Sequence, residues 1–313
     1  MSKPRYMIFA ASFVLSFTSW TDEARSQQPP PKGDPIRQSA PKVSPPSTKN
    51  MSDTRTDKRF MKNLPKGFIL PTTDAGKLLF REYGAVFLAR NGATPPRKVI
   101  FEGEWDVLEF QSSLKRSSQT IGGYRLELQS TAMTALTDAI EEAGRVGLSI
   151  TPRGSDSARR GYDQTVALWA SRVNPGLAHW VGKRRMTPEE AKRIKAMATF
   201  EQVTEILRLE RQGIYFAKDL SKSIIYSVAP PGGSQHLSML ALDVKEFGDL
   251  RVRTILASRG WFQTVVSDLP HFTFLGMPET ELPERGLKLV ISGGNRYWVP
   301  NLSEPAPGIS KPE

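Results

Sequence analysis

A sharp change in composition near residue 60 limits which part of the chain can fold. Residues 27–58, "QQPPPKGDPIRQSAPKVSPPSTKNMSDTRTDK", are rich in proline, serine and charge and carry almost no large apolar side chain. Such a segment cannot bury enough apolar surface to offset the entropy that it would lose on ordering. We therefore expect a disordered tether over residues 27–58 and a folded region that begins near Phe60.

The first residues have the pattern of an export signal. Lys3 and Arg5 precede an apolar run over residues 6–20, which is shorter than the roughly 20 residues that a membrane-spanning helix needs. Ala24 and Ser26 supply small residues before a cleavage point at Gln27. The pattern predicts a signal peptide over residues 1–26, and an uncleaved N-terminal anchor is the alternative. No other segment is long enough to cross a bilayer.

Charge and cysteine content exclude some classes of function. The 43 lysines and arginines outnumber the 32 acidic residues, and the formal net charge is +11. This charge favours an anionic partner such as nucleic acid, acidic lipid or a cell-wall polymer, although a solvated basic surface also explains it. The basic runs lack interleaved aromatic residues, so nucleic-acid binding is not supported. Cysteine is absent, which excludes disulfides, thiolate metal sites and a cysteine nucleophile.

The patterning of the folded region predicts an α+β domain. Residues 130–147 place Met133, Leu136 and Ala143 at helical spacing, and a second helix is expected from Thr187, with Pro188 at its first position, to Gly213. The segments "LALDV", "WFQTVV" and "HFTFLG" are typical of short strands, and "LSITPRGS" of a strand entering a turn. We expect helices packed on a small antiparallel sheet.

Residues 59–129 are harder to interpret and are taken as an N-terminal elaboration without an assigned role. The segment "KVIFEGEWDVLEFQSSL" suggests a strand that leads into a helix. Trp105, Leu108 and Phe110 are its candidate core residues.

The chain contains three histidines, and two of them lie near carboxylates in strand-like segments. His236 enters a segment in which period-two alternation places Met239, Ala241 and Asp243 on one face. A carboxylate on a half-buried face requires a compensating charge, which a divalent cation or an arginine supplies. His271 begins another strand, and two imidazoles with one carboxylate form a ligand set typical of catalytic zinc.

A purely structural role for these histidines also remains open at this point, because isolated histidines are common in cores and on surfaces. His236 can equally lie in a solvated turn that enters an ordinary strand. The third histidine, His179, lies between apolar neighbours in "GLAHW" and favours a packed structural role.

At these residues the chain resembles the VanY-like zinc D-alanyl-D-alanine carboxypeptidases, with their dipeptidase and endopeptidase relatives. The first signature of that family reads S-x-H-x-x-G-x-A-x-D, and Ser234, His236, Ala241 and Asp243 fall in register with it. The second is close to E-x-W-H, to which "DLPH" at residues 268–271 is similar. The resemblance covers residues 130–276, within an expected peptidase domain over 130–305 followed by a tail over 306–313.

The resemblance implies an exported zinc peptidase of the periplasm or cell envelope that hydrolyses peptidoglycan stem peptides. The bond that it implies first is the terminal D-alanyl-D-alanine bond. It implies Zn²⁺ held by His236, Asp243 and His271, with Asp268 as the catalytic base and Ser234 contacting substrate. The family's substrate-binding and catalytic arginine maps onto Arg153, with Arg159 or Arg160 as alternatives. A non-catalytic peptidoglycan-binding protein, or a peptidase of different bond specificity, remains the competing interpretation.

Three positions depart from the family pattern. Met239 stands where the family has glycine, which predicts a narrower site or a different backbone path. Pro270 replaces a tryptophan. Asp268 replaces the glutamate base and is one methylene shorter, so its carboxylate must act from a closer backbone or through a second water.

Overall fold

The computed structural model of the protein describes residues 54–266 and 268–302. All of these residues belong to one unit of the chain, Met51–Glu313. The expected signal peptide, most of the expected tether and the expected tail over 306–313 lie outside the described residues. The end of the expected tether, residues 54–58, lies in a helix. Within the described part of the chain, no helix combines the length and apolar character that crossing a membrane requires.

The described residues mix α-helices with small antiparallel sheets, as the α+β expectation required. The helices are α1 (Thr54–Lys62), α2 (Asp74–Tyr83), α3 (Glu104–Ser112), α4 (Ser130–Arg145), α5 (Tyr162–Gly182), α6 (Pro188–Lys195), α7 (Thr199–Glu210) and α8 (Leu250–Ser258), with short 3-10 helices η1 (Gly84–Leu88), η2 (Ile224–Tyr226), η3 (Gln235–Ser238) and η4 (Glu279–Glu281). The strands are β1 (Arg116–Ile121), β2 (Tyr124–Gln129), β3 (Ala241–Asp243), β4 (Trp261–Phe262), β5 (His271–Phe274), β6 (Leu287–Ser292) and β7 (Asn295–Pro300).

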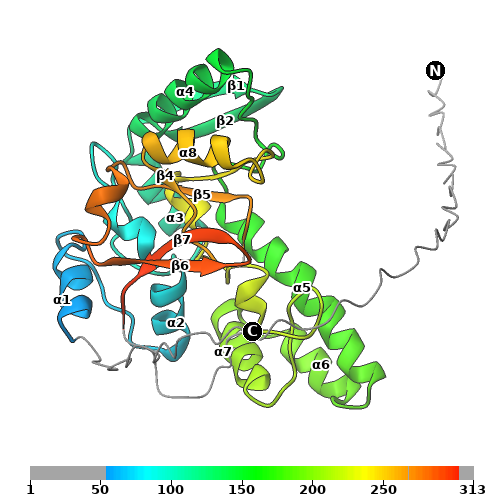
Figure 1. Ribbon diagram of the computed structural model, residues 1–313. Helices are drawn as coiled ribbons and strands as arrows, with labels where there is room; N and C mark the ends of the chain where they lie inside the picture. The colour runs from blue at the N-terminus through cyan, green and yellow to red at the C-terminus, as the bar shows by residue number, and fades with distance from the viewer. Residues whose placement is uncertain (1–53, 267, 303–313) are drawn as a thin grey trace, which may run out of the picture. The chain divides into compact units, whose positions relative to one another are not determined.

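The central sheet has the strand order β3-β5-β4, and its pairs are antiparallel. All four side chains of β5 are buried: Phe272 and Phe274 lie on one face, and His271 and Thr273 lie on the other, where they hydrogen-bond to buried partners. Helix α8 packs on β4 and α4 packs on α8, and Figure 1 shows these helices stacked beside the sheet. The register of the sheet places Asp243 of β3 directly opposite His271 of β5.

Helices α5, α6 and α7 gather around a second apolar core, away from α4 and α8 (Figure 1). Its largest side chains include Trp169, Val203 and Phe216. Helix α2 connects the two cores, because Leu78 packs in the second core while the adjacent Leu79 packs in the first. Adjacent residues of a helix point about 100° apart, which allows one helix to serve both cores.

Several expected elements are confirmed at nearly their predicted positions. The helix over 130–147 corresponds to α4, and Thr187 caps α6 with its side chain in a reciprocal bond with Glu190. Short strands occur within each of the three predicted strand segments of the sheet. The helix expected from Thr187 to Gly213 is instead divided into α6 and α7, which are separated near Ala196.

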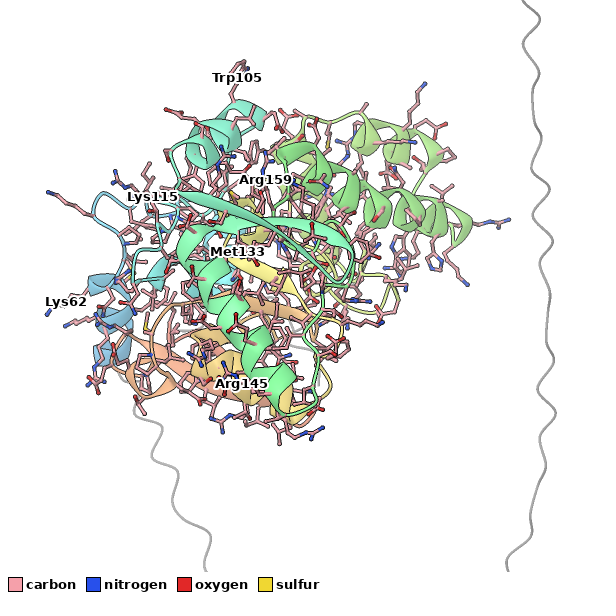
Figure 2. The ribbon with its side chains drawn as sticks, turned by 90° about the horizontal axis from the view of Figure 1, so that it is seen from above. Lys62, Trp105, Lys115, Met133, Arg145 and Arg159 are labelled. Carbon is pink, nitrogen blue, oxygen red and sulfur yellow. The ribbon has the colours of Figure 1, made fainter. Side chains whose placement is uncertain are left out.

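Other expectations are wrong. The segments around Lys98 and Pro152 form isolated bridges rather than strands, with Ile69 and Val244 respectively. Trp105 is 85% exposed and Leu108 is 38% exposed, so neither is a core residue. Figure 2 shows Trp105 projecting outward from α3.

The buried residues of α3 differ from the predicted ones. Val107 and Gln111, spaced four residues apart, point inward, while Phe110 is partly buried against Phe101. Two hairpins, β1–β2 and β6–β7, were not foreseen. Each turns at a Gly-Gly pair with positive φ, at Gly122–Gly123 and at Gly293–Gly294.

Candidate metal centre

His236, Asp243 and His271 meet in the folded protein and are called here the His–Asp–His cluster. One potential ligand atom from each lies within 4.8 Å of the other two. His236 Nε2 lies 3.3 Å and His271 Nδ1 lies 3.2 Å from the same oxygen, Asp243 Oδ1. Both histidines are buried, and the ring centroids are 4.9 Å apart. The expectation that these side chains converge is therefore confirmed.

A left-handed turn brings His236 to Asp243. His236 lies in η3. Met239, the residue that directly follows this 3-10 helix, has φ +58° and ψ +27°. The Met239 N–H donates to His236 O at 3.2 Å, and the Met239 carbonyl accepts from Gln129 N at 3.1 Å. Met239 therefore adopts the left-handed backbone conformation, which glycine adopts at a lower cost than any other residue.

The prediction that Met239, Ala241 and Asp243 share one face of a strand is wrong for Met239. Met239 lies in the turn before β3, and only Ala241 and Asp243 belong to the strand.

The hydrogen bonds of the two imidazoles determine which ring nitrogen carries the proton. His236 Nδ1 lies 2.7 Å from the carbonyl oxygen of Ala158, which can only accept, so Nδ1 is the donor. His271 Nε2 lies 2.8 Å from Gln235 Oε1. The Gln235 amide nitrogen donates to Tyr83 O at 2.7 Å, which orients its Oε1 towards His271. Each neutral histidine therefore presents its other nitrogen, as a lone pair, to Asp243.

Three acceptor atoms thus face one point, which is unfavourable unless a positive charge lies between them. Protonation of His236 is disfavoured, because burial lowers its pKa despite the nearby Asp243 carboxylate. Two imidazole nitrogens and one carboxylate oxygen fit a divalent cation, and zinc uses this donor set.

Arg160 binds the other oxygen of Asp243. Its Nη2 lies 2.8 Å from Asp243 Oδ2, and the guanidinium side chain is only 14% exposed. The Arg160 Nε also donates to Asp156 O at 3.0 Å. Because Arg160 occupies Oδ2, the carboxylate is oriented so that Oδ1 remains directed at the two histidines.

The other two candidate arginines lie in different surroundings. Arg153 is exposed, and its backbone N–H donates to Asp243 O at 3.1 Å. Arg159 turns towards the β1–β2 hairpin, where it lies 3.1 Å from Glu127 (Figure 2). Arg153 and Arg160 therefore lie beside the His–Asp–His cluster, whereas Arg159 is engaged elsewhere.

The cluster opens into a cavity of about 440 Å³, called here the cluster cavity. Asp268 lies in the exposed loop before β5, and its carbonyl accepts from His271 N at 3.2 Å. Ser234 precedes η3, and its hydroxyl makes no hydrogen bond to another described residue. The cavity lining includes every residue that the sequence assigned to the site: Arg153, Ser234, His236, Asp243, Asp268 and His271.

Sequence reasoning missed the partners that orient this site. Gln235 directly precedes His236, but no spacing rule distinguishes it from the other polar residues of the turn. The Ala158 carbonyl is invisible in a sequence because it belongs to the backbone. His179, by contrast, lies on α5 against the Trp180 ring and outside the cluster, as expected.

Comparison of the chain with protein-family models, with curated proteins and with solved structures found no match.

Proposed function

We propose that the protein is an exported zinc metallopeptidase of the cell envelope that cleaves peptidoglycan stem peptides, as a D-alanyl-D-alanine carboxypeptidase. The observation that carries the proposal is the convergence of two imidazole lone pairs on Asp243 Oδ1, in a cavity that Asp268 also lines. The resemblance to the VanY-like enzymes at Ser234–Asp243 and Asp268–His271 supplies the substrate class.

The residues of the cluster cavity divide into holding and reacting groups. When bound, zinc would supply a Lewis acid that makes water nucleophilic near neutral pH. The His–Asp–His cluster would hold it, with Gln235 and the Ala158 carbonyl orienting the imidazoles. Asp268 would accept a proton at its carboxylate from the attacking water and return that proton to the leaving amine.

Substrate binding would use polar side chains of the cavity that have no partner among the described residues. Arg153 forms no ion pair with another described residue, so its guanidinium can bind a peptide carboxylate or a developing oxyanion. The Ser234 hydroxyl is likewise without a partner in the described part of the chain. Arg160 is engaged with Asp243, and its role in this proposal is to orient that ligand.

A non-catalytic peptidoglycan-binding protein is the second candidate. The observation that favours it is the position of Asp268, a short carboxylate in an exposed loop where the family has glutamate. A peptidase that acts on ordinary L-peptides is a third outcome of the same experiment.

The test uses the zinc-loaded protein with purified peptidoglycan and with a synthetic peptide that ends in D-alanyl-D-alanine, analysed by mass spectrometry. We expect release of D-alanine by the wild type, none by Asp268→Asn, and retained zinc in both. Asp156→Asn is the matched control, because Asp156 is another exposed aspartate of the same cavity. Sedimentation with peptidoglycan without any release would support the binding protein, and cleavage of L-peptides alone would support the third outcome.

A further inference from the structure

Helix α5 contributes one wall of the cluster cavity. Leu168 and Arg172, four residues apart and therefore on the same face of the helix, both line the cavity. The segment from Tyr226 to Ala229 also contributes to the lining. Neither Leu168 nor Arg172 belongs to the two sequence signatures on which the proposed function rests.

Arg172 is held in place by uncharged partners. Its Nε lies 3.0 Å from Ser227 Oγ, and its Nη1 lies 2.9 Å from Ser171 Oγ. The residue is half-buried, and no carboxylate of the described residues forms an ion pair with it. Two hydroxyls thus orient the guanidinium, and neither neutralises its charge.

The other charges of the cavity are already engaged or assigned. Arg160 pairs with Asp243 and, at 3.9 Å, with Asp156. The carboxylate of Asp268 is assigned to proton transfer. An oriented and uncompensated guanidinium in a cavity wall is therefore suited to an anionic group of a ligand, and its planar fork matches a carboxylate.

The position of Arg172 separates it from the metal ligands. Helix α5 begins at Tyr162, directly after Arg160 and Gly161, and at 1.5 Å per residue Arg172 lies about 15 Å along its axis from that start. An extended peptide spans such a distance in roughly four residues. An anion bound at Arg172 therefore meets a different wall of the cavity from the metal ligands, which come from η3, β3 and β5.

We propose that Arg172 forms an anion subsite that selects substrates with a side-chain carboxylate within the four residues before the scissile bond. This inference rests on the proposed peptidase function and makes the substrate class narrower: acidic peptides with a D-alanyl-D-alanine end. Ser227 and Ser171 act as positioning residues for the guanidinium.

The test is a panel of N-acetylated peptides ending in D-alanyl-D-alanine, with glutamate or glutamine placed at each of the four positions before the scissile bond. For the wild type, one glutamate position should lower KM relative to its glutamine counterpart. Arg172→Gln should raise KM for that glutamate peptide roughly tenfold to a hundredfold, as loss of a hydrogen bond to a charged group predicts. The kcat, and the KM for the glutamine peptide, should stay unchanged.

Arg145→Gln is the matched control, because it removes the same charge from an exposed position on α4 outside the cavity. It should leave the preference for glutamate intact, which separates a local subsite from an effect of net charge. Turnover of the glutamine peptide by Arg172→Gln reports that this variant is folded. Equal KM values for glutamate and glutamine peptides in the wild type would overturn the inference while leaving the peptidase intact.

Calorimetric titration of the same peptides into Asp268→Asn separates the inference from the proposed function. A preference for the glutamate peptide that disappears in the Asp268→Asn, Arg172→Gln double variant supports the subsite even if no variant shows turnover. Binding of both peptides with equal affinity would remove the subsite.

Discussion

The Nε2 atom of His271 lies 2.8 Å from the Oε1 atom of Gln235, the residue that immediately precedes the other histidine of the cluster. This contact fixes the proton of His271 on the outer nitrogen and leaves Nδ1 free to face Asp243. Gln235 also donates to the Tyr83 carbonyl, so its amide has one orientation. A single side chain thus links the turn that carries His236 to the strand that carries His271.

Replacing Gln235 by methionine, which has a similar length and no amide, should weaken zinc binding about tenfold to a hundredfold. The reason is that His271 would lose the acceptor that holds its tautomer and ring orientation. Competition with a chromogenic chelator measures the affinity. Gln263→Met is the control, because Gln263 is also buried and its amide hydrogen-bonds to the Leu269 carbonyl and to neither histidine. An equal loss in both variants would assign the effect to general destabilisation.

His236→Ala and His271→Ala should each abolish stoichiometric zinc, because a half-buried carboxylate and one imidazole leave too few ligands for a tight site. Metal analysis of the purified variants provides the measurement. His179→Ala should keep its zinc, since that histidine lies outside the cluster. Added zinc should raise the melting temperature of the wild type and of His179→Ala only, because a ligand of the folded state stabilises it. Full zinc content in both cluster variants would refute the ligand assignment.

Met239→Gly should be more stable than Met239→Ala, although glycine usually costs more than alanine. Both substitutions remove the same buried side chain, but alanine retains the strain of a positive φ, which costs about 1–2 kcal/mol. The greater freedom of glycine in the unfolded chain offsets about 0.4–1 kcal/mol of that difference. Urea unfolding of the two variants gives the comparison. A more stable alanine variant would contradict a left-handed turn at this position.

Glu210 should make the protein less stable as the pH rises from about 4.5 to about 7. Burial raises the pKa of Glu210 from 4.5 to about 7, against the hydrogen bonds that it accepts from Ser223 and the backbone of Ile224 and Phe216. The folded state therefore binds the proton more tightly than the unfolded state, and its contribution is full below pH 4.5 and is lost as the pH rises through 7. A shift of this size corresponds to about 3 kcal/mol.

The variant Glu210→Gln should lack this component of the pH dependence. Its amide oxygen can accept from the two backbone N–H groups that now contact Oε1, and its nitrogen can donate to Ser223. Urea unfolding at pH 5 and pH 7.5, with a chelator present in all samples, gives the difference between variant and wild type. Parallel pH profiles for the two proteins would contradict the shifted pKa.

Trp105→Ala should change the free energy of unfolding by less than about 0.5 kcal/mol, because the indole is exposed. Val107→Ala, two residues away on the inner face of α3, should cost about 1–3 kcal/mol, because Val107 packs on Leu237 within η3. Chemical denaturation of both variants tests the order. The reverse order would mean that α3 is rotated from the position described here.

Local features of the fold were predictable from sequence because they depend on neighbours within a few residues. The apolar spacing of α4 and the Thr187 capping box are such features, and so are the short strands that carry Asp243 and His271. The buried face of α3 was assigned wrongly, because this short helix offers large apolar residues on more than one face and only packing selects between them.

The sequence by itself determined which residue types can bind a cation and their order along the chain: His236, Asp243, Asp268 and His271. Tertiary structure alone decided that Asp243 lies opposite His271 in the sheet, that Gln235 and the Ala158 carbonyl hold the imidazole protons, and that Arg160 takes one carboxylate oxygen. These contacts join residues 28 to 83 positions apart. The physical reason is that strand register and side-chain packing follow from the collective burial of both cores, which no local pattern encodes.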